Sequence, residues 1–282
     1  MNKLQEACCG VVGTIIVIAS GWCYNSYQSH PVPPLRKCCP VYPVHPVHPP
    51  RKCCPGPCSA SIFTVAPPIR NVGDLPPIIA DVESHLPAGH VYDDPDQVTT
   101  VHECTHVINS LLRNRYNCPA FYVLRNRAVL MQEPATTLSW STVADQVPVS
   151  LRGEVYGLYL KQMQNYWESN PTYVFDEWSA YTNGANARMA LGIKDRGETV
   201  RYAVEFIVYS MCVPRAAKST DPQMRAFIMW QTERVLKIVV SSGSARDWEY
   251  LKKLQADTDA ESLRRYIRSY CGAVWARKEL GL

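Results

Sequence analysis

The uneven distribution of prolines limits more than any other feature how this chain can fold. Fourteen of the 22 prolines lie between Pro31 and Pro77. Proline has no backbone N–H donor and fixes φ, so this stretch is expected to form neither a helix nor an interior strand. We therefore expect residues 24–77 to be an extended linker, largely in the polyproline II conformation.

This linker also contains a short repeat that is rich in cysteine and histidine. The sequence RKCCP of residues 36–40 recurs at residues 51–55, and prolines occupy every third position from Pro40 to Pro49. Cysteine and histidine are soft metal ligands, which suggests a metal-binding or cross-linking stalk. The alternative is a low-complexity spacer whose cysteines pair with one another, because the cysteines here are adjacent and do not have CxxC spacing.

The first 23 residues are apolar enough to suggest a role in export. Residues 7–19 read ACCGVVGTIIVIA, which has the length of a signal-peptide core but is short for a spanning helix. We expect residues 1–23 to be a signal peptide or a short membrane anchor, with a buried N-terminal helix as the alternative. Residues 20–23 (SGWC) also resemble a bacterial lipoprotein cleavage box, although Trp22 stands where a small residue is usual. Export predicts a secreted or membrane-anchored protein in an extracytoplasmic, oxidising compartment.

From residue 78 onward the composition becomes that of a globular domain, so residues 78–282 are expected to form one folded unit. The periodicity predicts an α+β fold that is predominantly helical. Residues 121–131 (FYVLRNRAVLM) are expected to form one or two strands, with a turn at Arg125–Arg127. Helices are expected over residues 96–113, 149–169 and 176–191, and the segments 198–212, 222–240 and 247–278 are expected to supply three or four more.

The most specific local pattern is HECTH at residues 102–106. Histidines four residues apart on a helix project from the same face, so His102 and His106 are expected to reach one metal ion. Glu103 lies beside them and is the candidate base for a metal-bound water. An apolar stripe at helical spacing, which includes Val101 and Ile108, places the two histidines on a neighbouring face of the same helix.

A catalytic zinc site needs a third protein ligand and an open position for water. The strongest candidate is Glu177 in the segment DEWSAY, residues 176–181. Together, HECTH and DEWSAY resemble the gluzincin metallopeptidases, in which a glutamate on a later helix completes the zinc site. That resemblance implies a zincin-like domain with His102, His106 and Glu177 as zinc ligands. A metzincin would instead carry a glycine and a third histidine where this chain has Asn109 and Leu112.

Other residues stay open as ligands or supporting groups. Asp176, Glu133 and Glu154 are alternatives to Glu177 as the acidic ligand. The supporting hydrogen-bond donors considered are Asn109, Tyr181, Tyr173, His90 and Arg188, each with core packing or surface exposure as the alternative role. Cys104, inside the motif, is expected to be a small buried apolar residue rather than a ligand.

The sequence therefore predicts a Zn²⁺-dependent metallopeptidase that acts on a peptide or protein substrate. The alternative is a zinc-stabilised binding or structural module without turnover, displayed on the proline-rich stalk. The net charge of +4 is spread without a basic stripe, so no nucleic-acid partner is expected.

Overall fold

A computed structural model describes residues 63–92, 94–134, 138–164, 170, 172–193, 198–243 and 245–282. The signal or anchor expected over residues 1–23 lies outside these residues, as does the cysteine-rich repeat of the linker. The end of the expected linker is described, and it takes part in the fold. There, Thr64–Val65 form a strand, and Ala66 is only 1% exposed.

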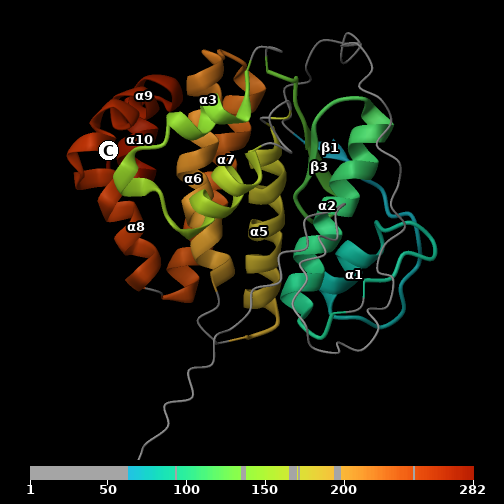
Figure 1. The fold of residues 1–282 in the computed structure, drawn as a ribbon. Helices are drawn as coiled ribbons and strands as arrows, with labels where there is room; N and C mark the ends of the chain where they lie inside the picture. Colours follow the sequence, from blue (N-terminus) through green and yellow to red (C-terminus); the bar gives the residue numbers. More distant parts are fainter. Residues whose placement is uncertain are drawn as a thin grey trace, which may run out of the picture. The chain divides into compact units, whose positions relative to one another are not determined.

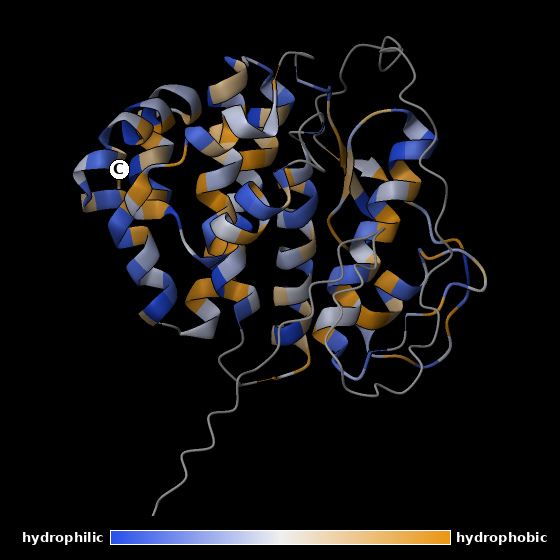
Figure 2. Ribbon diagram, in the orientation of Figure 1, coloured by the Kyte–Doolittle hydropathy of each residue, from blue (hydrophilic) through white to orange (hydrophobic). Residues whose placement is uncertain are grey.

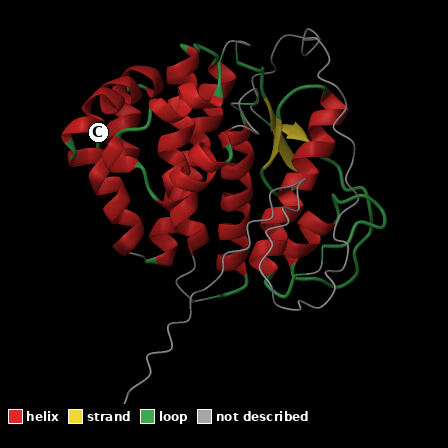
Figure 3. Ribbon diagram, viewed as in Figure 1, coloured by secondary structure: helices red, strands yellow, loops and turns green. Residues whose placement is uncertain are grey.

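The described part of the chain is mainly helical, with one small sheet (Figures 1 and 3). Its strands are β1 (Thr64–Val65), β2 (Ala120–Tyr122) and β3 (Arg127–Leu130). Its helices are α1 (Pro77–Glu83), α2 (Gln97–Tyr116), α3 (Trp140–Asp145), α5 (Tyr173–Ala190), α6 (Glu198–Ala217), α7 (Pro222–Ser242), α8 (Ala245–Ala256), α9 (Glu261–Cys271) and α10 (Ala273–Leu280). Three shorter helical segments are η1 (Val149–Leu151), the π-helix η2 (Tyr156–Gln162) and η3 (Thr258–Ala260). None of the described helices combines the length and apolar character needed to cross a bilayer.

The sheet is antiparallel, with β3 between β1 and β2. The turn between β2 and β3 lies close to the position expected at Arg125–Arg127. Leu124, Arg125 and Asn126 all adopt positive φ in this turn. Such a turn allows the chain to reverse tightly, so that Phe121 pairs with Val129. Of the one or two strands expected in this segment, the structure has two.

Helix α2 begins and ends at recognisable caps. The carboxylate of Asp96 accepts hydrogen bonds from the backbone N–H groups of Val98 (3.0 Å) and Thr99 (3.2 Å). Asn117 ends the helix in the left-handed conformation, with φ of 53°. The helix therefore starts one residue later than expected and runs three residues further.

Helix α5 packs against α2 on one side and α6 on the other, and α6 packs in turn against α7. In Figure 2, hydrophobic (orange) and hydrophilic (blue) residues are interspersed along the helices. The close approach of α5 to α2 depends on Gly184, where an added Cβ would lie 3.3 Å from the Val98 carbonyl oxygen. Small residues along α5, including Ala180, Gly184 and Ala187, thus bring its N-terminal part within reach of the histidines on α2.

The single helix expected over residues 149–169 is not observed. The chain forms η1, leaves helical geometry at Arg152 and resumes only before the π-helix η2. At the interruption, Gly153 passes so close to the buried Glu205 carboxylate that a Cβ would lie 2.3 Å from Oε2. Hydrophobic periodicity carries no information about such a contact with a distant helix, which explains the wrong prediction.

Candidate metal centre

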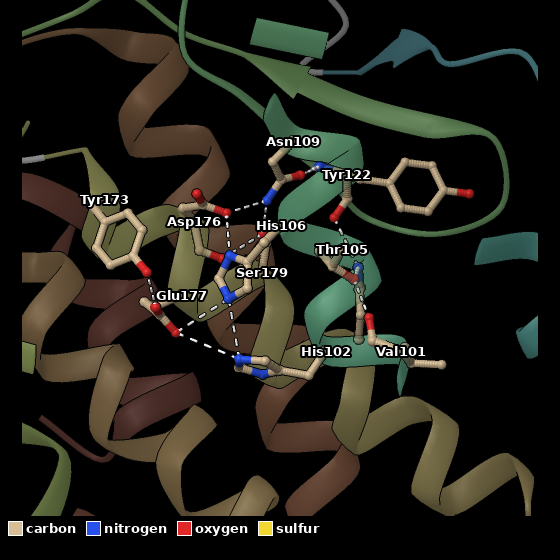
Figure 4. Close-up of polar contacts among 11 residues, drawn as sticks. Val101, His102, Thr105, His106, Asn109, Tyr122, Tyr173, Asp176, Glu177 and Ser179 are labelled. Carbon is tan, nitrogen blue, oxygen red and sulfur yellow. Dashed lines mark hydrogen bonds and ion pairs between the residues drawn. The ribbon is translucent and has the colours of Figure 1, made fainter. Parts of the chain in front are cut away.

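Two histidines and one glutamate converge between α2 and α5. His102 and His106 lie one turn apart on α2 and face the N-terminal part of α5, which supplies Glu177 (Figure 4). The side chains are nearly enclosed, since the exposed fractions of His106 and Glu177 are 6% and 2%. Of the residues that the structure describes, only these three form a group with metal-ligand spacing.

The distances between the donor atoms suit a small tetrahedral ion. The Nε2 atoms of His102 and His106 are 3.2 Å apart, and Glu177 Oε2 lies 3.7 Å from the first and 3.6 Å from the second. Ligands at about 2.0–2.2 Å from a tetrahedral ion stand about 3.3–3.6 Å from one another. These three atoms therefore leave space for one ion at normal zinc bond lengths.

Glu177 has one oxygen that is hydrogen-bonded and one that is not. Its Oε1 accepts a hydrogen bond from the Tyr173 hydroxyl, one turn earlier on α5. Its buried Oε2, which faces the two imidazoles, has no hydrogen-bond partner among the described residues. A buried carboxylate oxygen without a partner is costly, so this atom is explained best by a cation between it and the imidazoles.

His106 is oriented from behind by a second carboxylate. Its Nδ1 donates to Asp176 Oδ1 over 3.0 Å, which leaves Nε2 directed toward Glu177. The Nδ2 of Asn109 donates to the same Asp176 oxygen over 2.5 Å, and Asn109 Oδ1 accepts from the backbone N–H of Tyr122 over 2.6 Å. Histidine ligands of metals commonly have such a carboxylate partner, which fixes the ring and its tautomer.

The two imidazoles have opposite protonation preferences. Burial lowers the pKa of His102 well below its usual value, and the neighbouring His106 lowers it further. Burial acts in the same direction on His106, but Glu177 and Asp176 together outweigh it and hold its pKa well above the usual value. The Nε2 atoms of the two rings lie 3.2 Å apart, so the rings contact each other directly.

Glu103 follows His102 on α2 and is half-buried. Burial raises the pKa of its carboxyl to about 7, with His106 opposing the rise and Glu177 adding to it. Within the described chain, Glu103 forms no hydrogen bond or ion pair. Its carboxylate is therefore available to exchange a proton.

A pair of tyrosines covers the His102 side of the cluster. The ring of Tyr181 meets that of His102 edge to face, with centroids 4.3 Å apart. The Tyr181 and Tyr159 hydroxyls are hydrogen-bonded over 2.6 Å, and Tyr159 comes from the π-helix η2. Tyr181 thus contacts a histidine, whereas the residue bonded to Glu177 is Tyr173.

The structure places the other candidate residues away from the cluster or in supporting positions. Glu133 pairs with Arg113, and Glu154 pairs with Arg201. Of the remaining candidate donors, His90 lies near Arg70 and Glu83, and Arg188 lies about 16 Å further along α5 than Glu177. Cys104 is fully buried in an apolar cluster, and this burial raises the pKa of its thiol to about 12.

Sequence reasoning did not assign Asp176 and Tyr173 to their partners. The sequence leaves Asp176 open as a substitute ligand, whereas the structure makes it the hydrogen-bond partner of His106. Tyr173 lies four residues before Glu177, at the spacing that places two side chains on one helical face. This spacing is the feature of the sequence that could have indicated the contact between Tyr173 and Glu177. It does not distinguish Tyr173 from Tyr181, which lies four residues after Glu177.

No family model matches the chain, and comparisons with curated proteins and with solved structures give no match either. The resemblance to gluzincins thus remains limited to the two short segments that carry it.

Proposed function

We propose that this chain is a zinc-dependent metallopeptidase with a zincin-like domain. The observation that supports the proposal most strongly is Glu177 Oε2, which has no hydrogen-bond partner in the described part of the chain and lies 3.6–3.7 Å from the two imidazole nitrogens. Two imidazoles and one carboxylate form the ligand set of a catalytic zinc site, which keeps one position open.

The spacing of the donor atoms also bears on the choice of metal. Octahedral ions with similar bond lengths hold neighbouring ligands about 3.0 Å apart. Two of the three separations, 3.6 and 3.7 Å, are well above that value. The spacing therefore favours a tetrahedral ion such as Zn²⁺ over an octahedral one.

In this mechanism each group has a defined task. His102 and His106 would bind through Nε2 and Glu177 through Oε2, while Asp176 keeps the His106 ring in place. Bound zinc would polarise the peptide carbonyl and lower the pKa of a water molecule toward about 7. Glu103 accepts the proton of the attacking water and passes it to the leaving amine.

Replacing Glu103 with glutamine tests this role directly. Glu103→Gln keeps the size of the side chain but cannot accept the proton. We expect unchanged zinc content, measured by elemental analysis, and a loss of peptide hydrolysis of about 100-fold or more. Glu154→Gln, on an exposed glutamate paired with Arg201, is the matched control and should keep full activity. Full activity in Glu103→Gln would refute the assignment.

A zinc-stabilised binding or structural module remains the second candidate. The low exposure of His106 and Glu177 favours it, since structural sites are closed to solvent. This candidate predicts stoichiometric zinc without cleavage of any member of a broad peptide library. Either function is compatible with export and display on the proline-rich segment, which we propose from the N-terminal sequence.

A further inference from the structure

A second cluster of charged side chains lies apart from the metal centre, where the β2–β3 hairpin meets α7. Arg125 and Arg127 come from the hairpin, and Trp230 and Arg234 lie one turn apart on α7. Arg127, Trp230 and Arg234 are half-buried, whereas Arg125 is exposed. Three arginines from two distant segments thus gather at one partly open position.

The tryptophan ring organises this cluster. The guanidinium carbon of Arg234 lies 5.6 Å from the centre of the Trp230 ring, and that of Arg127 lies 5.9 Å from it. Arg127 also lies 4.7 Å from the ring of Phe63, which meets Trp230 edge to face. The aromatic contacts limit the rotation of both guanidinium groups and hold them in place without neutralising them.

The hydrogen bonds of the cluster leave donors unused. Arg234 donates to two neutral amides, Asn183 Oδ1 over 2.8 Å and Gln231 Oε1 over 3.4 Å. The Nε–H of Arg127 is buried and has no acceptor among the described residues. Buried donors are almost always paired in folded proteins, so this N–H indicates an acceptor that the chain does not provide.

Negative charge is also scarce around these arginines. Burial lowers the pKa of Arg234 to about 9, and the charges of Arg127 and Arg125 lower it further. Asp81 is the carboxylate that raises the pKa of Arg234. One of its oxygens already accepts a hydrogen bond from the backbone N–H of Arg125 over 2.8 Å. Residues 1–62 contain only one acidic residue, Glu6, so that part of the chain offers little compensation.

We propose that Arg127, Arg234 and Trp230 form a binding site for an oxyanion, such as a phosphate or carboxylate group of a small molecule. Guanidinium groups bind such groups through paired N–H donors, and a partly desolvated position strengthens these bonds. The unused Nε–H of Arg127 supplies one donor of that pair. This site is independent of the metal centre and of the proposed peptidase activity.

Titration with inorganic phosphate and with succinate tests the proposal on the full chain, with chloride at equal ionic strength as the reference. We expect at least one of the two anions to raise the melting temperature and to give saturable binding in calorimetry. Phosphate binding alone would identify phosphoryl compounds as the ligand class, and succinate binding alone would identify carboxylates. No saturable binding of either anion would overturn the proposal.

Substitutions in the arginine cluster test where the anion binds. Arg127→Gln should weaken it at least about tenfold, since charge-assisted hydrogen bonds are lost. Arg234→Gln is a second variant on a different element, which keeps the test usable if the first variant does not fold. The matched control is Arg152→Gln, because Arg152 also lies over an aromatic ring, that of Tyr156, at 4.9 Å. The assignment would be contradicted if Arg152→Gln lost as much anion affinity as the cluster variants. It would also be contradicted if neither Arg127→Gln nor Arg234→Gln lost anion affinity.

Discussion

At the scale of single residues, two adjacent carboxylates on α5 have different tasks. Glu177 Oε2 faces both imidazoles, whereas Asp176 Oδ1 accepts from the far side of the His106 ring. Glu177→Gln removes the proposed ligand and should weaken zinc binding by well over 100-fold, while Asp176→Asn removes only the orienting bond and should cost about 10–100-fold. Competition with a chromogenic chelator measures both affinities.

The control for this ranking is Glu133→Gln, which changes a half-exposed glutamate paired with Arg113. Its zinc affinity should equal that of the parent. If Asp176→Asn lost zinc more completely than Glu177→Gln, the roles of the two carboxylates would be reversed.

Single residues also show what a sequence can and cannot specify about a site. The separation of His102 and His106 fixes their common face, because both lie on one helix. The choice of Glu177 over Asp176 depends on how α5 is rotated against α2. That rotation follows from packing with α2 and α6, which no local pattern in the sequence reports.

At the scale of secondary-structure elements, the break between η1 and η2 gives a sharp test of packing. Gly153 leaves no room for a side chain, because Glu205 is 0% exposed and is held by the Tyr209 hydroxyl at 2.9 Å. Gly153→Ala should lower the free energy of unfolding by about 1–3 kcal/mol, as overpacked positions do. Gly157→Ala, in the nearby π-helix with no atom within 4 Å of the new Cβ, should be neutral or stabilising. Urea denaturation measures the free energy of unfolding of both variants. Equal values for Gly153→Ala and Gly157→Ala would contradict the close contact between Gly153 and Glu205.

The elements that the sequence predicted well are those whose formation is local. Periodicity and caps place α2, α5 and α7 within a few residues of their observed ends. The hairpin was also predicted, since its turn residues are local. Strand β1 was not, because Thr64–Val65 become a strand only by pairing with β3, more than 60 residues later. The short α3 was missed as well, since its six residues are too few for a periodic signal.

At the scale of the whole molecule, the candidate metal centre joins parts of the fold that have separate cores. α2 belongs largely to an apolar cluster with α1 and the sheet, whereas the first turns of α5 contribute to the larger cluster with α6 and α7. An ion held by residues of both helices would therefore link the two clusters. Zinc would act on the stability of the fold as a whole, beyond the local geometry of the site.

Zinc should therefore raise the melting temperature of the chain, and a chelator should lower it. At a free zinc concentration about 1,000 times the dissociation constant, the gain is about 4 kcal/mol. For a domain of this size, that gain corresponds to a rise of about 8–16 °C, which differential scanning calorimetry resolves. The Cys- and His-rich residues before position 60 would be a second place for zinc if they form the metal-binding stalk expected from the sequence, so the parent alone does not locate the effect. Glu177→Gln separates the two, since only the centre between α2 and α5 loses a ligand. An equal rise in the parent and in Glu177→Gln would place the stabilising ion outside that centre and would remove the physical basis of the proposed enzyme.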